Sequence, residues 1–389
     1  MSNWLLPENI SDVLPHEARA VEDLRRSLLD LYRSFGYEYV IPPLIEHLES
    51  LLSGTDRDLD LRTFKLVDQS SGRSLGVRAD ATPQTARIDA HILNRNGVVR
   101  LCYAGPALHA RPLHPLASRE PIQVGAELYG DGAIEADGEV LQLAARSLEL
   151  TGARRIRIDL GHSGVVRAIL GGEKLAQQDL DEILRALNSK DLSSLKSACC
   201  GLGVAAREAV LRLTDLHGEV SVLERAGREL PGSAELERAL SQLQHLATLC
   251  PSGTAGIDLA DLHGYRYYTG LTFAAYVGGS PGPILRGGRY DDIGRAFGRA
   301  RPATGFSIVD LREAAQLGQP GQPPPAIVAP YAQDRELDAL VAQLRTQGHI
   351  VVRTDAGRIA EGWFEFDREI RRVGTHWRVV VREPRSGGN

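Results

Sequence analysis

The chain has 389 residues, 43% of them apolar, so it can bury a large core and form two or three domains. Its 45 basic side chains are outnumbered by 50 acidic ones, and the net charge of −5 argues against a protein whose main task is to bind nucleic acid. The amino terminus has no basic leader with a long apolar run, and no segment reaches the ~20 apolar residues of a membrane span. We therefore expect a cytoplasmic protein that does not enter a membrane.

The first predicted element is a helix. Apolar side chains recur at spacings of three and four from Val21 to Phe35, which places them on one helix face. The helix is expected to begin near Pro15 and to end at Gly36. Residues 39–41 then predict a short strand, which leads into two prolines that suit a sheet edge or a subunit interface.

Two strands are predicted next, at residues 99–103 and 121–128. The second alternates, with apolar residues on one face and Gln123, Gly125 and Glu127 on the other. At ~3.3 Å per residue, Gln123 and Glu127 lie about 13 Å apart, which is wide enough to bracket a small amino acid. This polar face suits the floor of a ligand site, and a solvent-facing sheet edge is the alternative.

The middle of the chain is expected to be helical. A helix at residues 140–150 and a strand at 155–160 precede a polar, leucine-striped region from about 165 to 250. We interpret this region as an inserted helical subdomain. Strands are expected again at 255–259 and 267–277, followed by glycine- and proline-rich turns from 278 to 288.

The carboxy-terminal part is predicted to be separate. Residues 316–325 are predicted to be a linker between a first domain, 1–315, and a small α/β domain, 326–389. The elements expected in the small domain are strands at 326–329, 349–352 and 377–381 and a helix at 335–346.

Cysteine usage indicates a reduced protein. Cys102, Cys199, Cys200 and Cys250 contain no Cys-x-x-Cys pair, and the adjacent Cys199 and Cys200 are unsuited to a disulfide. We expect buried, reduced thiols.

Several segments between residues 12 and 312 carry motifs. The clearest are Asp12 to Glu46, Gly76 to Thr82, Gln123 to Glu127 and Leu262 to Tyr268, with further matches at 63–68, 105–111, 287–291 and 304–312. Together they resemble the histidyl-tRNA synthetases. The resemblance implies an α+β fold, with a class II aminoacyl-tRNA synthetase-like antiparallel sheet flanked by helices, a helical insertion and a small C-terminal α/β domain.

The resemblance also implies a histidine pocket. The positions that match the family's ligand-binding residues are Asp80 and Thr82 for the α-ammonium, Gln123 for the backbone end, Glu127 for the imidazole, and Tyr267 and Tyr268 for the walls of the ring pocket. A carboxylate and a hydroxyl are suitable acceptors for an ammonium group. A helix cap at Asp80 and a purely structural role for the tyrosine pair on its predicted strand are the alternatives.

The matching ATP side lacks charge. His109 and His263 stand where the family has arginines, so the resemblance marks them as lost catalytic positions, and Arg111 replaces a glutamate. A mostly neutral imidazole cannot replace a charged, bidentate guanidinium on a phosphate. Neither histidine has paired His or Cys ligand spacing around it, so we expect no metal and no cofactor.

The carboxy-terminal domain is shorter than the anticodon-binding domain of the synthetases. From residue 353 onward, eight arginines face six acidic residues, which is too balanced for an RNA-binding surface, so nucleic-acid binding is not expected.

A histidine pocket beside a weakened ATP site and a short carboxy-terminal domain is similar to the regulatory subunit of ATP phosphoribosyltransferase. That resemblance implies a non-catalytic chain required for the first step of histidine biosynthesis, with L-histidine as effector. It also implies partnership with the short-form catalytic subunit, as dimers within a hetero-octamer. An active histidyl-tRNA synthetase and a stand-alone histidine-sensing or RNA-binding regulator are the alternatives.

Overall fold

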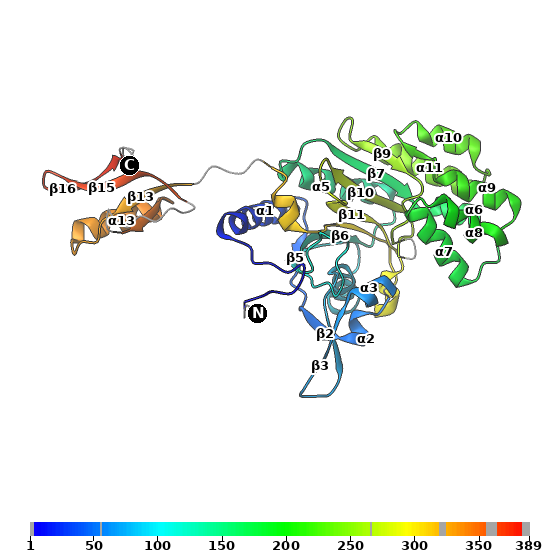
Figure 1. Cartoon of the computed structure of the whole chain (residues 1–389), viewed down its shortest axis with the longest axis horizontal. Helices are drawn as coiled ribbons and strands as arrows, with labels where there is room; N and C mark the ends of the chain where they lie inside the picture. Colours follow the sequence, from blue (N-terminus) through cyan, green and yellow to red (C-terminus); the bar gives the residue numbers. More distant parts are fainter. Residues whose placement is uncertain (1–3, 55–56, 265–266, 319–323, 355–363, 383–389) are drawn as a thin grey trace. The chain divides into compact units, whose positions relative to one another are not determined.

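The computed structural model describes residues 4–54, 57–264, 267–318, 324–354 and 364–382 (Figure 1). It divides into two compact units, one made of Met1–Val13 with Arg19–Gln319 and the other of Leu14–Ala18 with Pro320–Asn389. The predicted linker is described only in part, because residues 319–323 lie outside the described residues. Among the described helices, none has the length and apolar character that crossing a membrane requires.

The larger unit is built on a nine-stranded sheet with the order β1-β5-β6-β12-β11-β10-β7-β9-β8. The strands are β1 Glu38–Tyr39, β5 Val99–Pro106, β6 Ile122–Tyr129, β7 Ile156–His162, β8 His217–Gly218, β9 Ala255–Asp258, β10 Leu271–Val277, β11 Leu285–Arg289 and β12 Ala303–Ile308. The strands from β5 to β7 in this order pair antiparallel, whereas β1 with β5 and β7 with β9 pair parallel. The central strands thus have the predicted antiparallel arrangement.

Helices cover the apolar face of this sheet. The side chains of Val124, Ala126 and Leu128 on β6 are buried in one cluster with residues of α1 Pro15–Ser34 and α5 Ile134–Leu150. The same alternation turns Gln123 and Glu127 to the opposite face. The predicted first helix and the two-faced strand are therefore confirmed, and the polar face is not a solvent-facing edge, because Glu127 is only 1% exposed.

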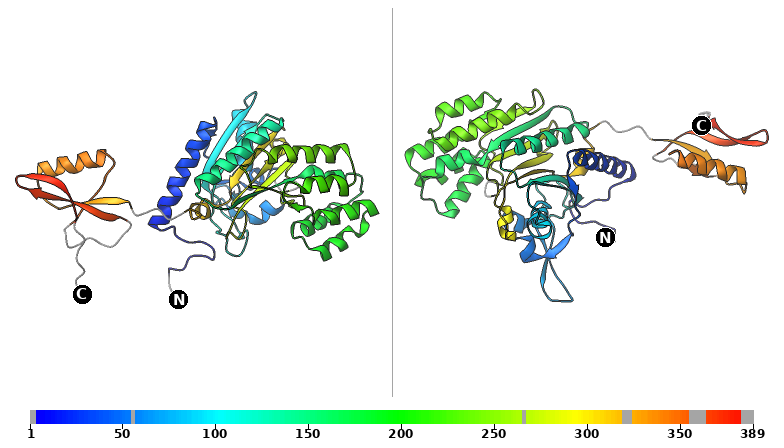
Figure 2. Two further views of the ribbon diagram at one scale, coloured as in Figure 1. Left: turned by 90° about the horizontal axis from the view of Figure 1, so that it is seen from above. Right: turned by 180° about the vertical axis from the view of Figure 1, so that it is seen from behind.

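The insertion is helical at one end of the sheet (Figures 1 and 2). Its helices are α6 Ser163–Leu170, α7 Gln177–Asn188, α8 Leu192–Ala198, η2 Cys199–Gly201, α9 Val204–Leu213, α10 Val222–Glu229 and α11 Ala234–Ala247. The leucine-rich faces of α7 and α11 pack into the main core, with Leu187 and Leu243 fully buried. The insertion also contributes β8 to the sheet. Helical periodicity did not predict this strand.

A smaller sheet and short helices cover the other face near β5 and β6. The strands β2 Ile45–His47, β4 Ser74–Val77 and β3 Phe64–Val67 pair in that order. The short helices on this face are α2 Leu48–Leu51, α3 Arg57–Arg62, α4 Thr82–Arg87, the π-helical η1 Ile88–Leu93 and η3 Ile293–Phe297, whereas α12 Leu311–Ala315 packs into the core cluster on the apolar face.

Two predictions in this unit are wrong. The strand expected at 267–277 begins only at Leu271, and Tyr267 and Tyr268 lie before it in a turn in which both backbone N–H groups donate to the Gly264 carbonyl. The turns expected up to residue 288 end earlier, because Leu285–Arg289 forms β11 in the middle of the sheet. Glycines concealed this strand, since their pattern is typical of loops.

Arg289 lies at the centre of a buried ion-pair cluster. Its Nε donates to both carboxylate oxygens of Asp137 at 3.0 Å, and Nη1 donates to Asp291 at 3.2 Å. The guanidinium also donates to the carbonyls of Asp131 and Ala133. Arg289 thus joins β11 to the beginning of α5, a structural role for a segment that the sequence marked only as a glycine-rich turn.

The smaller unit has a four-stranded sheet with the order β14-β13-β15-β16. Its elements are β13 Pro325–Ala329, α13 Arg335–Thr346, β14 Ile350–Arg353, β15 Glu365–Val373 and β16 His376–Val381. Ile327, Leu337, Val341 and Ile370 form its buried core. The sequence missed β15, because Ile370 is its one fully buried apolar side chain among charged neighbours. Five of the charged residues counted from 353 onward lie outside the described residues: Asp355, Arg358, Glu361, Glu383 and Arg385.

The cysteine prediction holds for three of the four thiols. Cys102, Cys199 and Cys250 are buried and free, whereas Cys200 is exposed. Burial raises the pKa of the Cys102 thiol to about 12, so this thiol is not reactive at neutral pH.

Candidate functional site

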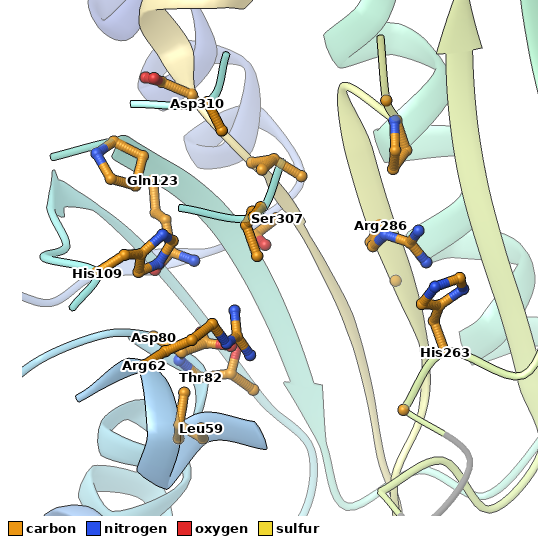
Figure 3. Close-up of a pocket in the computed structure, with 18 of the residues that line it drawn as sticks. Leu59, Arg62, Asp80, Thr82, His109, Gln123, His263, Arg286, Ser307 and Asp310 are labelled. Carbon is orange, nitrogen blue, oxygen red and sulfur yellow. The ribbon is translucent and has the colours of Figure 1, made fainter. Parts of the chain in front are cut away.

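A cavity of about 630 Å³ opens on the polar face of the large sheet (Figure 3). All eight residues singled out from the sequence line it: Asp80, Thr82, His109, Gln123, Glu127, His263, Tyr267 and Tyr268. The floor comes from β6, β12 and β11, one wall from α4 and the loop after β5, and the other from the segment before β10. Tyr265 and Arg266 of that segment lie outside the described residues.

Glu127 lies at the bottom of the cavity with one oxygen satisfied and one free. Oε1 accepts hydrogen bonds from the Thr82 hydroxyl at 2.9 Å and the Tyr103 hydroxyl at 3.2 Å. Oε2 is buried and has no partner among the described residues. A buried acceptor without a partner is unfavourable, so this oxygen is suited to a ligand that donates a hydrogen bond.

The pKa of the Glu127 carboxyl is raised well above its usual range, because burial disfavours the charged form and the nearby Asp80 adds to the effect. Hydrogen bonds from Thr82 and Tyr103 oppose the shift and do not overcome it. A carboxyl whose pKa is higher in the folded chain binds its proton more tightly when folded. Its contribution to stability is therefore complete below the unfolded pKa of about 4.3 and is lost as pH rises toward the folded pKa.

Glu127→Gln should therefore raise the melting temperature at pH 7.5, and the gain should shrink toward zero as pH falls to about 4. Thermal unfolding of both proteins across this range tests the prediction. Glu149→Gln, at an exposed position on α5, is the matched control and should show no such trend. A gain at Glu127→Gln that is the same at every pH would contradict the assignment of a raised pKa.

Asp80 and Thr82 lie at the start of α4. One Asp80 oxygen accepts from the Thr82 backbone N–H at 3.0 Å, which fixes the turn before the helix, while its second oxygen remains available to a ligand. Asp80 is not the N-cap, because that position is Ala81. The Thr82 hydroxyl proton is already used, since it is donated to Glu127, and the oxygen, 3.1 Å from the Tyr103 hydroxyl, is left as an acceptor. Thr82 therefore orients the carboxyl of Glu127 directly.

Gln123 is held in one orientation. Its side-chain oxygen accepts from the Ala81 backbone N–H at 3.0 Å, and the residue is only 8% exposed. The amide nitrogen is consequently left as a donor at the cavity, which suits a carboxylate or a carbonyl oxygen.

Three tyrosines form an aromatic wall. Tyr267 stacks on Tyr290 with ring centroids 4.8 Å apart and meets Tyr268 edge to face at 5.3 Å. The hydroxyls of Tyr267 and Tyr290 are buried without partners among the described residues. The sequence identified Tyr267 and Tyr268 but missed Tyr290 and Tyr103, which reach the site only through strand pairing.

Gly305 gives Glu127 its space. It pairs with Glu127 across β12 and β6. A Cβ atom at residue 305 would lie 1.7 Å from Glu127 Oε2 and 2.6 Å from the Tyr290 hydroxyl. The two unpartnered polar groups therefore converge beside a glycine, an arrangement typical of a formed binding site.

His109 is a poor substitute for an arginine. It is 2% exposed, and its Nε2 donates to the Ala79 carbonyl at 3.0 Å. Burial, together with the charge of Arg62, lowers its pKa, so the imidazole is neutral at pH 7. It cannot supply the charge that a phosphate group requires.

His263 is tied to a neighbouring acid. Its Nδ1 lies 2.5 Å from Asp261 Oδ1. Burial alone would raise the pKa of Asp261, but the His263 hydrogen bond and the charge of Arg286 outweigh it and lower the pKa to about 2. Three arginines also line the cavity, of which the sequence placed Arg111 on the ATP side and did not predict Arg62 and Arg286. Within the described ranges, no group of three or more His, Cys, Asp or Glu residues could hold a metal.

Comparisons with known proteins agree with this architecture. The family model for histidyl-tRNA synthetase matches residues 9–313. A crystal structure from Bacillus halodurans, titled as an ATP phosphoribosyltransferase regulatory subunit/histidyl-tRNA synthetase, has a TM-score of 0.81 at 27% identity and covers 93% of this chain and 96% of that one. The sheet and its cavity thus define a class II, histidyl-tRNA synthetase-like protein, which confirms the predicted fold class.

A second family model, ATP phosphoribosyltransferase subunit HisZ C-terminal domain, matches residues 324–380. The ATP phosphoribosyltransferase regulatory subunit of Cupriavidus metallidurans is 52% identical over 384 residues, covering 98% of this chain and all of that one. The regulatory subunit of Burkholderia pseudomallei is 53% identical over 92% of this chain and 93% of its own length. The chain belongs to the family of ATP phosphoribosyltransferase regulatory subunits. It is a non-catalytic regulatory subunit in histidine biosynthesis, as predicted.

Proposed function

We propose that this regulatory subunit senses L-histidine in the cavity on its large sheet. The observation that carries the proposal is the unpartnered Oε2 of Glu127, buried beside the free hydroxyls of Tyr267 and Tyr290. An imidazole N–H would satisfy this oxygen, and ligands without that donor would leave it unpaired. Sites that hydrogen-bond their ligand in this way reject analogues that lack the group.

The remaining polar groups fit the other end of an amino acid. The free oxygen of Asp80 suits the α-ammonium, and the free amide of Gln123 suits the carboxylate. Tyr267 and Tyr268 would enclose the ring. In this proposal Thr82 acts through Glu127 as well as on the ligand.

Regulation of an enzyme implies association with its catalytic subunit. We propose the short-form catalytic subunit as partner, with dimers of the present chain inside a hetero-octamer in the cytoplasm. In this proposal residues 1–315, with the insertion at about 165–250, form the sensing domain. Residues 316–325 form the linker, and 326–389 a separate small domain.

Histidine must favour one subunit arrangement over another to act as an effector. A difference in binding free energy of ~1 to 3 kcal/mol between the two arrangements would change catalytic behaviour 5- to 150-fold.

Calorimetric titration of the isolated chain with L-histidine tests the sensing role. We expect saturable binding, with no comparable binding of amino acids that lack an imidazole. Absence of histidine binding would exclude the proposed site. Histidine-dependent exchange of pyrophosphate with ATP would instead favour an active synthetase, which the neutral, buried His109 opposes.

A further inference from the structure

Arg286 is a cavity residue with unused donors. It is the second residue of β11, and its side chain is 32% exposed where it lines the cavity. Its closest charged neighbour is Asp261, at 3.9 Å, which is too far for a hydrogen bond. In the part of the chain that the structure describes, no acceptor receives a hydrogen bond from this guanidinium. Five N–H donors are therefore available to a bound group.

Strand pairing places Arg286 on the same sheet face as Glu127. Arg286 pairs with Ser307 on β12, and Ser307 pairs with Gly125 on β6. Residues that pair directly project to the same face, and Glu127 follows Gly125 by two residues. With strands ~4.8 Å apart and ~3.3 Å per residue, the Cα atoms of Arg286 and Glu127 are about 12 Å apart.

The sheet surface between these two residues carries small side chains. The open part of this surface is on β12, where Gly305 and Ser307 line the cavity and neither carries a large side chain, whereas the Tyr103 ring lies over Gly125. A small ligand can thus lie flat on the sheet, with one end at Glu127 and the other within reach of the long arginine side chain. Figure 3 shows Arg286 beside His263 on the wall opposite Asp80, Thr82 and Gln123.

We propose that Arg286 binds the α-carboxylate of the amino-acid ligand from the side opposite Gln123, so that the carboxylate lies above Ser307 and accepts from both side chains. This inference rests on the proposed histidine site and extends it to a residue that the sequence did not single out. The guanidinium presents a planar fork that matches a carboxylate with two hydrogen bonds. His263 cannot form such a two-pronged contact, since its Nδ1 is already bound to Asp261 and only one ring nitrogen is left. Arg286 thus places a positive charge near His263, the position where the related synthetases have an arginine.

The assignment has a consequence for specificity. A ligand with both an imidazole and a carboxylate satisfies Glu127 and Arg286 together. Histamine has the same ring and amine and lacks the carboxylate, so it leaves the Arg286 donors unused. The full-length chain should therefore bind L-histidine about 10- to 100-fold more tightly than histamine, which is the gain in affinity expected from a charge-assisted hydrogen bond.

The test compares both ligands on three proteins by calorimetry: the natural chain, Arg286→Gln and Arg154→Gln. Arg286→Gln should lose most of the preference for histidine and keep its affinity for histamine, and Arg286→Lys should recover part of the preference. Arg154→Gln removes the same charge from an exposed position after α5 and should bind like the natural chain.

Two outcomes would overturn the assignment while the histidine site stands. One is an Arg286→Gln variant that keeps the full preference for histidine. The other is equal weakening of both ligands, which would show that Arg286 only shapes the cavity. If the natural chain bound neither ligand, the proposed site and this inference would fall together.

Discussion

Replacing Gly305 with alanine is expected to weaken L-histidine binding by roughly 100-fold or more. Losses of this size are typical when the buried group that hydrogen-bonds a ligand, here the Glu127 carboxyl, is displaced. The added Cβ would lie 1.7 Å from Glu127 Oε2, and it would also meet the Ala126 carbonyl oxygen at 2.7 Å. The carboxyl has to move away from the added methyl group, which takes Oε2 out of the position proposed for its bond to the imidazole, and the backbone carbonyl is fixed by β-sheet pairing. Calorimetric titration measures the loss.

Gly172→Ala is the control for this prediction. A Cβ atom at residue 172 would have no heavy atom within 4 Å, so the substitution adds a methyl group without a clash. Its histidine affinity should equal that of the natural chain. Thermal unfolding of both variants separates loss of the site from loss of the fold, because overpacking in a core typically destabilises by about 1 to 3 kcal/mol. Retained histidine affinity in a folded Gly305→Ala protein would contradict the geometry proposed for Glu127.

The largest effect on stability is expected from Arg289→Ala, at about 3 to 5 kcal/mol. This substitution removes the ion-pair partner of Asp137, which is only 6% exposed, and leaves its buried carboxylate without a paired positive charge. It also removes the donors to two backbone carbonyls at the start of α5. Urea-induced unfolding at neutral pH gives the change in the free energy of unfolding.

Arg295→Ala provides the comparison. Arg295 pairs with Asp292 on the surface, where both side chains are largely exposed. Exposed pairs contribute less than about 1 kcal/mol, so this variant should unfold almost like the natural chain. If the two arginine variants lost the same stability, the buried cluster would not have the structural role assigned to it.

Local sequence patterns predicted the sheet-covering elements well, because each of them buries one face. The alternation of β6 separated an apolar face from the face that carries Gln123 and Glu127, and the spacing in α1 identified its buried side. Where burial on one face is weak, prediction failed. β15 has a single fully buried apolar side chain, and β11 is concealed by glycines that make room for neighbouring side chains.

The site was predicted to the extent that its residues occur in motifs. All eight expected residues meet at the cavity. Tyr290 and Gly305 were missed as ligand-site residues, and so was Arg286, because their roles depend on cross-strand register and not on neighbouring sequence. Gly305 matters through its pairing with Glu127, and Arg286 through its pairing with Ser307. Such contacts follow from β11, β12 and β6 being adjacent, which the local sequence does not show.

The most direct test of histidine sensing by this chain is the histidine dependence of the reconstituted enzyme. The chain would be combined with a short-form ATP phosphoribosyltransferase, and turnover would be measured over a range of L-histidine concentrations with the natural chain and with Glu127→Gln. We predict inhibition by histidine in the natural complex, and a shift of at least about 10-fold to higher histidine in the variant, since glutamine replaces one of the two carboxyl oxygens by an NH2 donor and leaves a buried group unpaired. Identical inhibition curves for the two complexes would contradict the proposal that histidine acts through this cavity.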